Sequence, residues 1–237
     1  QALCPNLESV ALVVAWFGTD LRAGQCRILP GVEVETRRDE STVWSVAGVV
    51  RSNAHRVSLS GGGPAYGGTP GDASVLAAIT DLKARGLKVF LYPFVMMDIA
   101  PGNGLADPYG QTEQASYPWR GRITCHPAAG LAGSADRTAL ARTQVEAFAS
   151  GAEGYRRMVL HYAGLSNTAG GVEGLVIGSE LRGLTQIRDQ TGAFPFVEAL
   201  VTLASDVRAL VGAATALTYG ADWSEYFGYH PQDGSGD

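Results

Sequence analysis

Residues 10–17 form an unbroken apolar run that ends at Gly18. An apolar run of strand length without polar alternation predicts a strand that is buried on both faces, as in a parallel sheet. Four further runs predict strands in the same way, which makes about five in all: residues 43–50, 88–97, 172–178 and 215–219. Pro93 lies inside the run 88–97, and because proline cannot donate to a strand ladder, we expect a bulge or an irregular strand end there.

Helical periodicity appears between these runs. Apolar side chains recur at helical spacing in four segments: residues 72–86, 137–150, 154–169 and 194–211. Asp72 is predicted to cap the first of these helices, and Gly86 and Gly212 are predicted to end the first and the last. The alternation of strands and helices predicts an α/β fold built on a parallel sheet.

Two segments interrupt this alternation and are expected to be loop insertions. Residues 51–71 are rich in glycine, and residues 98–135 show no periodicity. A doubly wound nucleotide fold is disfavoured, because no G-x-G-x-x-G follows the first strand and no P-loop motif occurs. We therefore predict a TIM-type (β/α)8 barrel. Once the insertions are subtracted, 237 residues are too few for eight strand–helix units, so residues 1–237 are expected to be one incomplete barrel domain cut from a longer protein.

Composition argues against several classes of protein. The net charge of −5, from 18 basic and 23 acidic residues, argues against binding to a nucleic-acid backbone. No apolar run reaches the roughly 18 residues of a membrane span. Three cysteines do not make a disulfide framework, and the sequence leaves open whether Cys4 and Cys26 pair. No cofactor and no metal are expected, since Cys125-His126 has no second pair at zinc-like spacing.

Carboxylates and aromatic side chains follow the predicted strands, where barrel enzymes carry their catalytic groups. Glu180 is the sharpest candidate, because a buried strand must open into a loop there. The alternative is that Glu180 forms a structural ion pair with Arg182 or another arginine. For Asp98 and Asp222, helix capping or loop hydrogen bonding is favoured over a chemical role. The pattern suits carbohydrate chemistry, in which one carboxyl group protonates the leaving oxygen and another attacks or activates water.

Five motifs, taken together, are similar to those of one family. They are the segments 13–18, 64–70, 87–98, 175–185 and 219–226. On these motifs the chain resembles, over nearly its whole length, the TIM-barrel-like domain of gene transfer agent and phage tail proteins of alphaproteobacteria. Those proteins are the large multidomain baseplate component that is also called megatron or host-specificity protein.

The resemblance implies a glycoside-hydrolase-like barrel inside a tail-tip protein. In the related glycosidases a glutamate after strand four is the acid/base, and Glu180 is taken to match it. Ser179 stands where those enzymes usually carry an Asn that contacts the sugar. Their nucleophile follows strand seven and is expected beyond residue 237. The sugar site is expected to be lined by these side chains: Trp16, Asp98, Trp119, Tyr219, Asp222 and Trp223.

Three functions follow as hypotheses. The first is a structural component of a phage-like tail baseplate, whose barrel serves assembly or contact with the cell envelope. The second is a retaining glycosidase that acts on envelope glycan such as peptidoglycan or capsule, and the third is a non-catalytic glycan-binding module. The expected partners are other tail proteins and envelope glycan. The expected location is the particle tail, after synthesis in the cytoplasm, and the sequence leaves open whether the chain forms a homo-oligomer.

Overall fold

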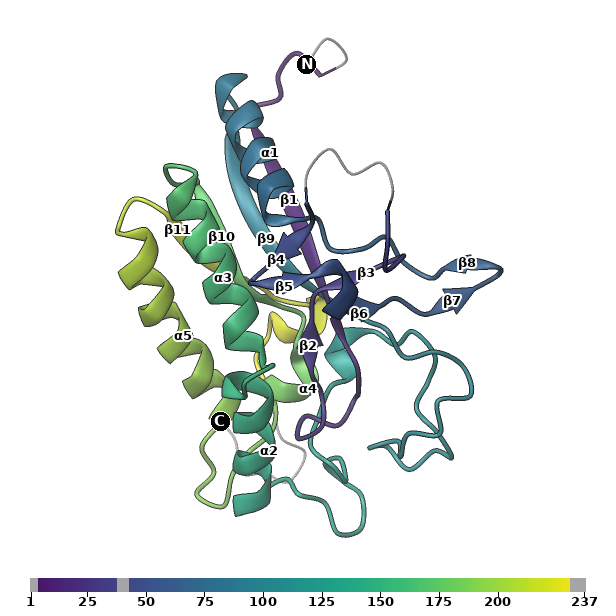
Figure 1. Cartoon of the computed structure of the whole chain (residues 1–237). Helices are drawn as coiled ribbons and strands as arrows, with labels where there is room; N and C mark the ends of the chain where they lie inside the picture. The colour runs from purple at the N-terminus through teal and green to yellow at the C-terminus, as the bar shows by residue number, and fades with distance from the viewer. Residues whose placement is uncertain (1–3, 38–42, 231–237) are drawn as a thin grey trace.

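A five-stranded sheet lies at the centre of the protein in a computed structural model that describes residues 4–37 and 43–230 (Figure 1). Its strand order is β11-β10-β9-β1-β2. Four strands run parallel and neighbour one another in chain order: β1 (Ser9–Gly18), β9 (Lys88–Met97), β10 (Gly174–Ser179) and β11 (Ala216–Gly220). The short strand β2 (Ile28–Leu29) is antiparallel to the end of β1. Among the described residues the sheet stays open and does not close into a barrel.

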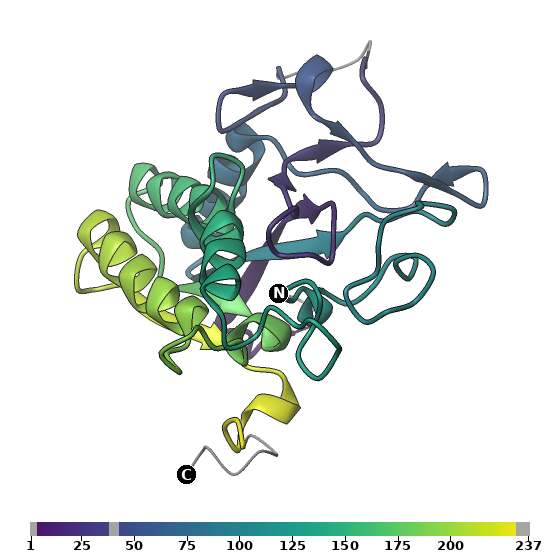
Figure 2. The ribbon, with the colours of Figure 1, turned by 90° about the horizontal axis from the view of Figure 1, so that it is seen from below.

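Helices cover one face of this sheet. Figures 1 and 2 show three of them side by side along the strands: α1 (Asp72–Ala84), α3 (Tyr155–Thr168) and α5 (Pro195–Val211). A fourth helix, α2 (Ala139–Ser150), packs against α3 and α5. On β1, Val14 is fully buried, whereas its neighbour Val13 is 52% exposed. The alternation shows that the hydrophobic core lies between sheet and helices, while the other face remains partly open.

The predicted helices and the strands 10–17, 88–97, 172–178 and 215–219 are confirmed to within about two residues at most ends. The cap of α1 differs from the prediction, because Gly71 occupies the N-cap position and Asp72 lies in the first turn. The Asp72 carboxylate instead accepts hydrogen bonds from His161 Nε2, at 2.8 Å, and from the Ala47 backbone N–H, at 3.2 Å. Asp72 therefore connects three segments of the chain.

Pro93 lies in a continuous strand, contrary to the expected irregularity. It pairs in register with Val14 of β1 inside the unbroken strand β9. On its other edge β9 pairs with β10 only at Phe90 and Leu91. Because the ladder on that edge has ended before residue 93, the missing N–H of proline costs no hydrogen bond there.

The prediction that residues 43–50 form a strand of the central sheet is wrong. They form a small hairpin of β4 (Ser45–Val46) and β5 (Val49–Val50), which is separate from that sheet. Ala47 and Gly48 make the turn with positive φ angles of 50° and 79°. A pair of left-handed residues is the conformation that a tight two-residue hairpin requires, and the apolar run hides this turn.

The predicted loop insertions gather near the carboxyl ends of the strands, on the right of Figures 1 and 2. The first holds only short elements: η1 (Arg51–Asn53), β6 (His55–Arg56), which pairs with β3 (Gly31–Val32), and the hairpin of β7 (Leu59–Ser60) and β8 (Gly63–Pro64). The second is irregular apart from the 3-10 turn η2 (Arg120–Arg122). Buried Gln114 ties it to the loop after β1, since its side chain accepts from the Leu21 N–H and donates to Asp20, at 2.8 and 2.7 Å.

The three thiols, including those of Cys4 and Cys26, are free in the structure. Burial raises the pKa of the Cys26 thiol to about 12. A thiol in this state stays protonated at neutral pH and is a poor nucleophile.

Lys83 stabilises the far end of a neighbouring helix. Its Nζ donates to the carbonyls of Ala169, Gly170 and Gly171, at 2.9–3.1 Å, where α3 ends. These carbonyls would otherwise lack partners at the negative end of the helix dipole. We expect Lys83→Met to lower the free energy of unfolding by about 1 kcal/mol, measured by urea denaturation. Lys88→Met, at the exposed start of β9, is the control, and equal losses in the two variants would contradict this role.

Candidate functional site

The carboxyl ends of β1, β9, β10 and β11 meet at one edge of the sheet, because these strands are parallel. Glu180 directly follows β10, and Asp98 directly follows β9. The turn η2, with Trp119 just before it, reaches the same edge and contacts Glu180. This edge therefore holds the candidate site.

Glu180 has a strained backbone. Its N–H donates to the Gly220 carbonyl at 2.9 Å, which extends the pairing of β10 with β11 by one residue. Its φ angle is 51°, in the left-handed region that non-glycine residues rarely adopt. Strain of this kind costs on the order of 1–3 kcal/mol and concentrates at functional sites. The left-handed conformation of Glu180 turns the chain sharply after Ser179.

The Glu180 carboxylate is held by two donors on one oxygen. Trp119 Nε1 donates to Oε2 at 2.7 Å, and Arg120 Nη2 lies 3.0 Å from the same atom. Glu180 Oε1 accepts no hydrogen bond from any residue that the structure describes, and the side chain is 35% exposed. The carboxylate is thus fixed in direction while one oxygen remains available to a ligand. The arginine partner is Arg120, not Arg182.

Trp119 presents an aromatic face beside this carboxylate. Its side chain is 38% exposed, although the indole N–H is already used by Glu180. A Cβ at position 121 would lie 2.4 Å from the indole ring, so Gly121 is what allows the ring to lie against the turn. A partly exposed indole next to a carboxylate oxygen offers both a stacking surface and a hydrogen-bond acceptor.

Asp98 serves the local structure and is closed to ligands. Its side chain is only 1% exposed, and it accepts from His55 Nε2 at 2.7 Å and from the Ser58 N–H and Oγ at 3.0 and 2.6 Å. Burial alone would raise the pKa of Asp98, but the hydrogen bonds from His55 and Ser58 outweigh it and hold the pKa below its usual value. The expectation that Asp98 contacts a sugar does not fit this geometry, whereas the alternative of loop hydrogen bonding does.

Trp16 is likewise a core residue. It is fully buried on the helical side of β1, where Nε1 donates to Tyr162 OH at 3.0 Å and Arg157 stacks over the ring at 4.9 Å. The expectation that it lines a sugar site is wrong for this structure. A position near a strand end does not by itself show which face of the sheet a side chain lies on, because successive side chains of a strand point to opposite faces.

The end of β11 and the residues after it form a local capping unit. Asp222 caps η3 (Trp223–Glu225) by accepting from Ser224, as the capping alternative expects. Tyr219 OH donates to Glu225 at 3.1 Å and accepts from the Leu181 N–H at 2.8 Å. Burial raises the pKa of the Tyr219 phenol, so the hydroxyl stays protonated. Trp223 is 78% exposed, so its aromatic face is open to solvent.

The loss of residues 43–50 from the sheet changes the strand count. Glu180 follows the third of the four parallel strands, not the fourth. The carboxylates of Asp98, Asp222 and Glu225 each bind local partners. Within the part of the chain that the structure describes, no group of three or more His, Cys, Asp or Glu side chains gathers as metal ligands. None of the described helices combines the length and apolar character needed to cross a bilayer.

The comparison with protein families agrees with the barrel-type topology. Residues 153–237 match the GTA TIM-barrel-like domain family. Parallel strands in chain order, helices on one face and this match together give a TIM-barrel-type α/β fold whose barrel is not closed among the described residues. No curated protein matches the chain in sequence.

Two solved structures of a GH113 beta-1,4-mannanase, one of them a complex, are similar to this chain. Their TM-scores are 0.43 and 0.42, at 16% and 14% sequence identity. The similarity covers 90% and 88% of this chain but 44% of each mannanase chain. This chain therefore spans less than half the length of those proteins.

Sequence reasoning missed the partners of Glu180 and Asp98. Arg120 reaches Glu180 across 60 positions, and His55 and Ser58 reach Asp98 across about 40. Trp119, an aromatic residue in the aperiodic segment 98–135, is a local signal in the sequence. Nothing in the sequence marks His55 or Ser58.

Proposed function

We propose that this chain is a structural part of a phage-like particle tail, and that its barrel-type domain contacts cell-envelope glycan at Glu180 and Trp119. The observation that carries the contact is the fixed, partly exposed carboxylate beside a partly exposed indole at the carboxyl edge of the sheet. The match of residues 153–237 to the GTA TIM-barrel-like domain supports the tail context.

Carbohydrate suits the two groups for a chemical reason. A pyranose ring has an apolar face that stacks on an indole and hydroxyl groups at its rim that donate to a carboxylate. Glu180 Oε1 is the acceptor that has no partner among the described side chains, and Trp119 lies directly beside it. Trp223, highly exposed just after β11, offers a second open aromatic face at the carboxyl end of a sheet strand.

A second candidate function, glycan cleavage, is favoured by the strained backbone of Glu180. A retaining glycosidase needs a second carboxyl group about 5–5.5 Å from the first. Under this hypothesis Glu180 is the acid/base. Product release from glycan by the full-length protein, lost in Glu180→Gln, would favour cleavage over binding.

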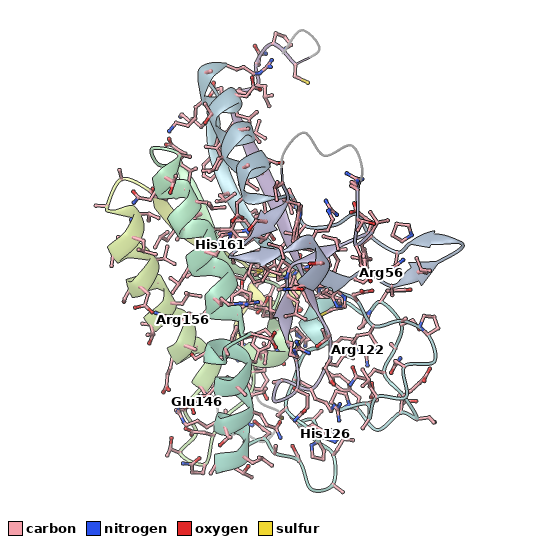
Figure 3. All side chains as sticks on the ribbon, viewed as in Figure 1. Arg56, Arg122, His126, Glu146, Arg156 and His161 are labelled. Atoms are coloured by element: carbon pink, nitrogen blue, oxygen red, sulfur yellow. The ribbon has the colours of Figure 1, made fainter. Side chains whose placement is uncertain are left out.

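Binding is tested with Glu180→Gln in the full-length protein. We expect its affinity for purified peptidoglycan sacculi, or for capsular polysaccharide as the second probe, to fall about tenfold or more, because an ionised acceptor is replaced by a neutral amide. Co-sedimentation and calorimetry measure this loss. Glu146→Gln is the matched control, since Glu146 lies on α2, far from the loop that carries Arg122 (Figure 3). Wild-type protein that binds neither polymer would overturn the proposal.

A further inference from the structure

We infer that Arg120 is the positioning residue of this site, and that it makes the site selective for uncharged sugar hydroxyls over cationic sugars; the inference rests on the proposed glycan contact. Arg120 belongs to a loop that joins β9 to α2, whereas Glu180 follows β10. The contact between them therefore fixes a loop and a strand end in one geometry.

One guanidinium holds both the backbone and the side chain of the Glu180 segment. Arg120 Nε donates to the Ser179 carbonyl at 2.9 Å, and Nη2 donates to Ser179 Oγ at 2.9 Å. The same Nη2 lies 3.0 Å from Glu180 Oε2. Because Ser179 is 3% exposed and engaged by Arg120, it is not available to contact a ligand. The planar guanidinium presents its N–H donors from separate nitrogens in a rigid fork, a geometry that the single ammonium nitrogen of a lysine cannot reproduce.

The guanidinium itself has little freedom. Its Cζ lies 3.7 Å from the ring centre of Phe94 on β9, and the Arg120 side chain is 6% exposed. The stacking on Phe94 adds a cation–π attraction. Strand β9 therefore supports Arg120 from one side, and the carboxylate meets it from another.

The turn that carries Arg120 is supported by the helix that follows Glu180. A Cβ at position 183, in α4 (Arg182–Thr185), would lie 2.4 Å from the Ile123 carbonyl oxygen and 2.8 Å from that of Gly121. Backbones of α4 and η2 thus touch, and Gly183 allows this approach. The segments on both sides of the Arg120–Glu180 pair cannot shift independently.

The charge balance of the pair determines which ligand groups fit. Arg120 offsets the charge of Glu180, while Trp119 and Arg120 occupy Oε2. What remains is an acceptor oxygen, Oε1, in a pair without net charge. Such an acceptor suits a neutral hydroxyl donor, whereas an ammonium group gains little net attraction from a carboxylate that is already neutralised.

The positioning role is tested first without ligand. The indole N–H signal of Trp119 in a ¹H–¹⁵N spectrum, assigned by its loss in Trp119→Phe, reports the bond to Glu180. We expect Arg120→Met to shift this signal upfield as the carboxylate loses its orientation. Arg122→Met is the control, because Arg122 stacks on Tyr109 at 4.7 Å and has no bond to Glu180. An unmoved Trp119 signal in Arg120→Met would overturn the role. Arg120→Lys, expected to shift the signal less, serves if the methionine variant does not fold.

Selectivity is tested with two tetrasaccharides, neutral N-acetylated chitotetraose and its cationic deacetylated form. We expect Arg120→Met to weaken binding of the neutral tetramer about tenfold, and to move the ratio of the two affinities towards the cationic tetramer. An unchanged ratio would contradict the inference. Failure of wild-type protein to bind sacculi, capsule or either tetramer counts against the proposed function, whereas the ligand-free indole signal tests Arg120 by itself.

Discussion

Replacing Trp16 by alanine is expected to lower the free energy of unfolding by about 3–5 kcal/mol, the range for removal of a large aromatic side chain from a packed core. The indole is fully buried between β1 and α3, and its N–H bonds Tyr162 OH at 3.0 Å. Truncation would leave a cavity between sheet and helix, an unpartnered Tyr162 hydroxyl, and an Arg157 guanidinium without its aromatic partner.

Guanidinium chloride denaturation followed by far-UV circular dichroism measures this loss. Trp223→Ala is the matched control, because it makes the same change at a side chain that is 78% exposed. We expect that variant to unfold close to wild type. A Trp16→Ala protein as stable as Trp223→Ala would show that Trp16 is not part of the core.

Asp98→Asn is expected to destabilise the protein by about 3 kcal/mol at neutral pH, since a buried carboxylate that accepts three hydrogen bonds is converted to a neutral amide. Asp98 connects β9 to His55 and Ser58, and Ser58 Oγ in turn lies 3.1 Å from Tyr117 OH. The substitution therefore loosens the first insertion from the end of the sheet. Chemical denaturation at pH 7 measures the loss.

The same substitution changes the acid sensitivity of the fold. The pKa of Asp98 is lower in the folded protein than its ordinary value of 3.8. A lowered carboxylate pKa stabilises the fold fully above the unfolded value, and this contribution is lost as the pH falls through the folded value. The stability difference between wild type and Asp98→Asn should thus shrink below about pH 4. Asp206→Asn, at an exposed ion pair, is the control. A stability difference between wild type and Asp98→Asn that stays constant down to about pH 2 would contradict the lowered pKa of Asp98.

The strands and helices of the sheet were predictable because they follow simple periodicities. Buried parallel strands such as β1 and β9 appear as continuous apolar runs, and α5 shows one apolar face. Residues 43–50 misled the prediction because Ala47-Gly48 is a weak turn signal inside an apolar run. The apolar composition of residues 43–50 fits a local hairpin and a central strand equally well. Only the pairing of strands in the folded protein distinguishes the two.

The site was predictable in part. Glu180 and Trp119 could be proposed one at a time from their position after a strand and in an aromatic-rich loop. Their contact depends on the path of a loop without periodicity, and so does the role of Arg120. Trp16 and Asp98 occupy strand-end positions that look equivalent in sequence. The structure separates them because one faces the helices and the other is enclosed by His55 and Ser58.

The glycan contact is tested most directly by the indole N–H signals of the four tryptophans in a ¹H–¹⁵N spectrum recorded with soluble peptidoglycan fragments. Trp119 lies beside the open oxygen of Glu180, whereas Trp16 and Trp44 are buried. We predict that saturating fragments shift the Trp119 signal and leave those of Trp16 and Trp44 in place, and that the shift is absent in Glu180→Gln. Fragments that bind while the Trp119 signal stays unmoved would contradict a glycan site at Glu180 and Trp119.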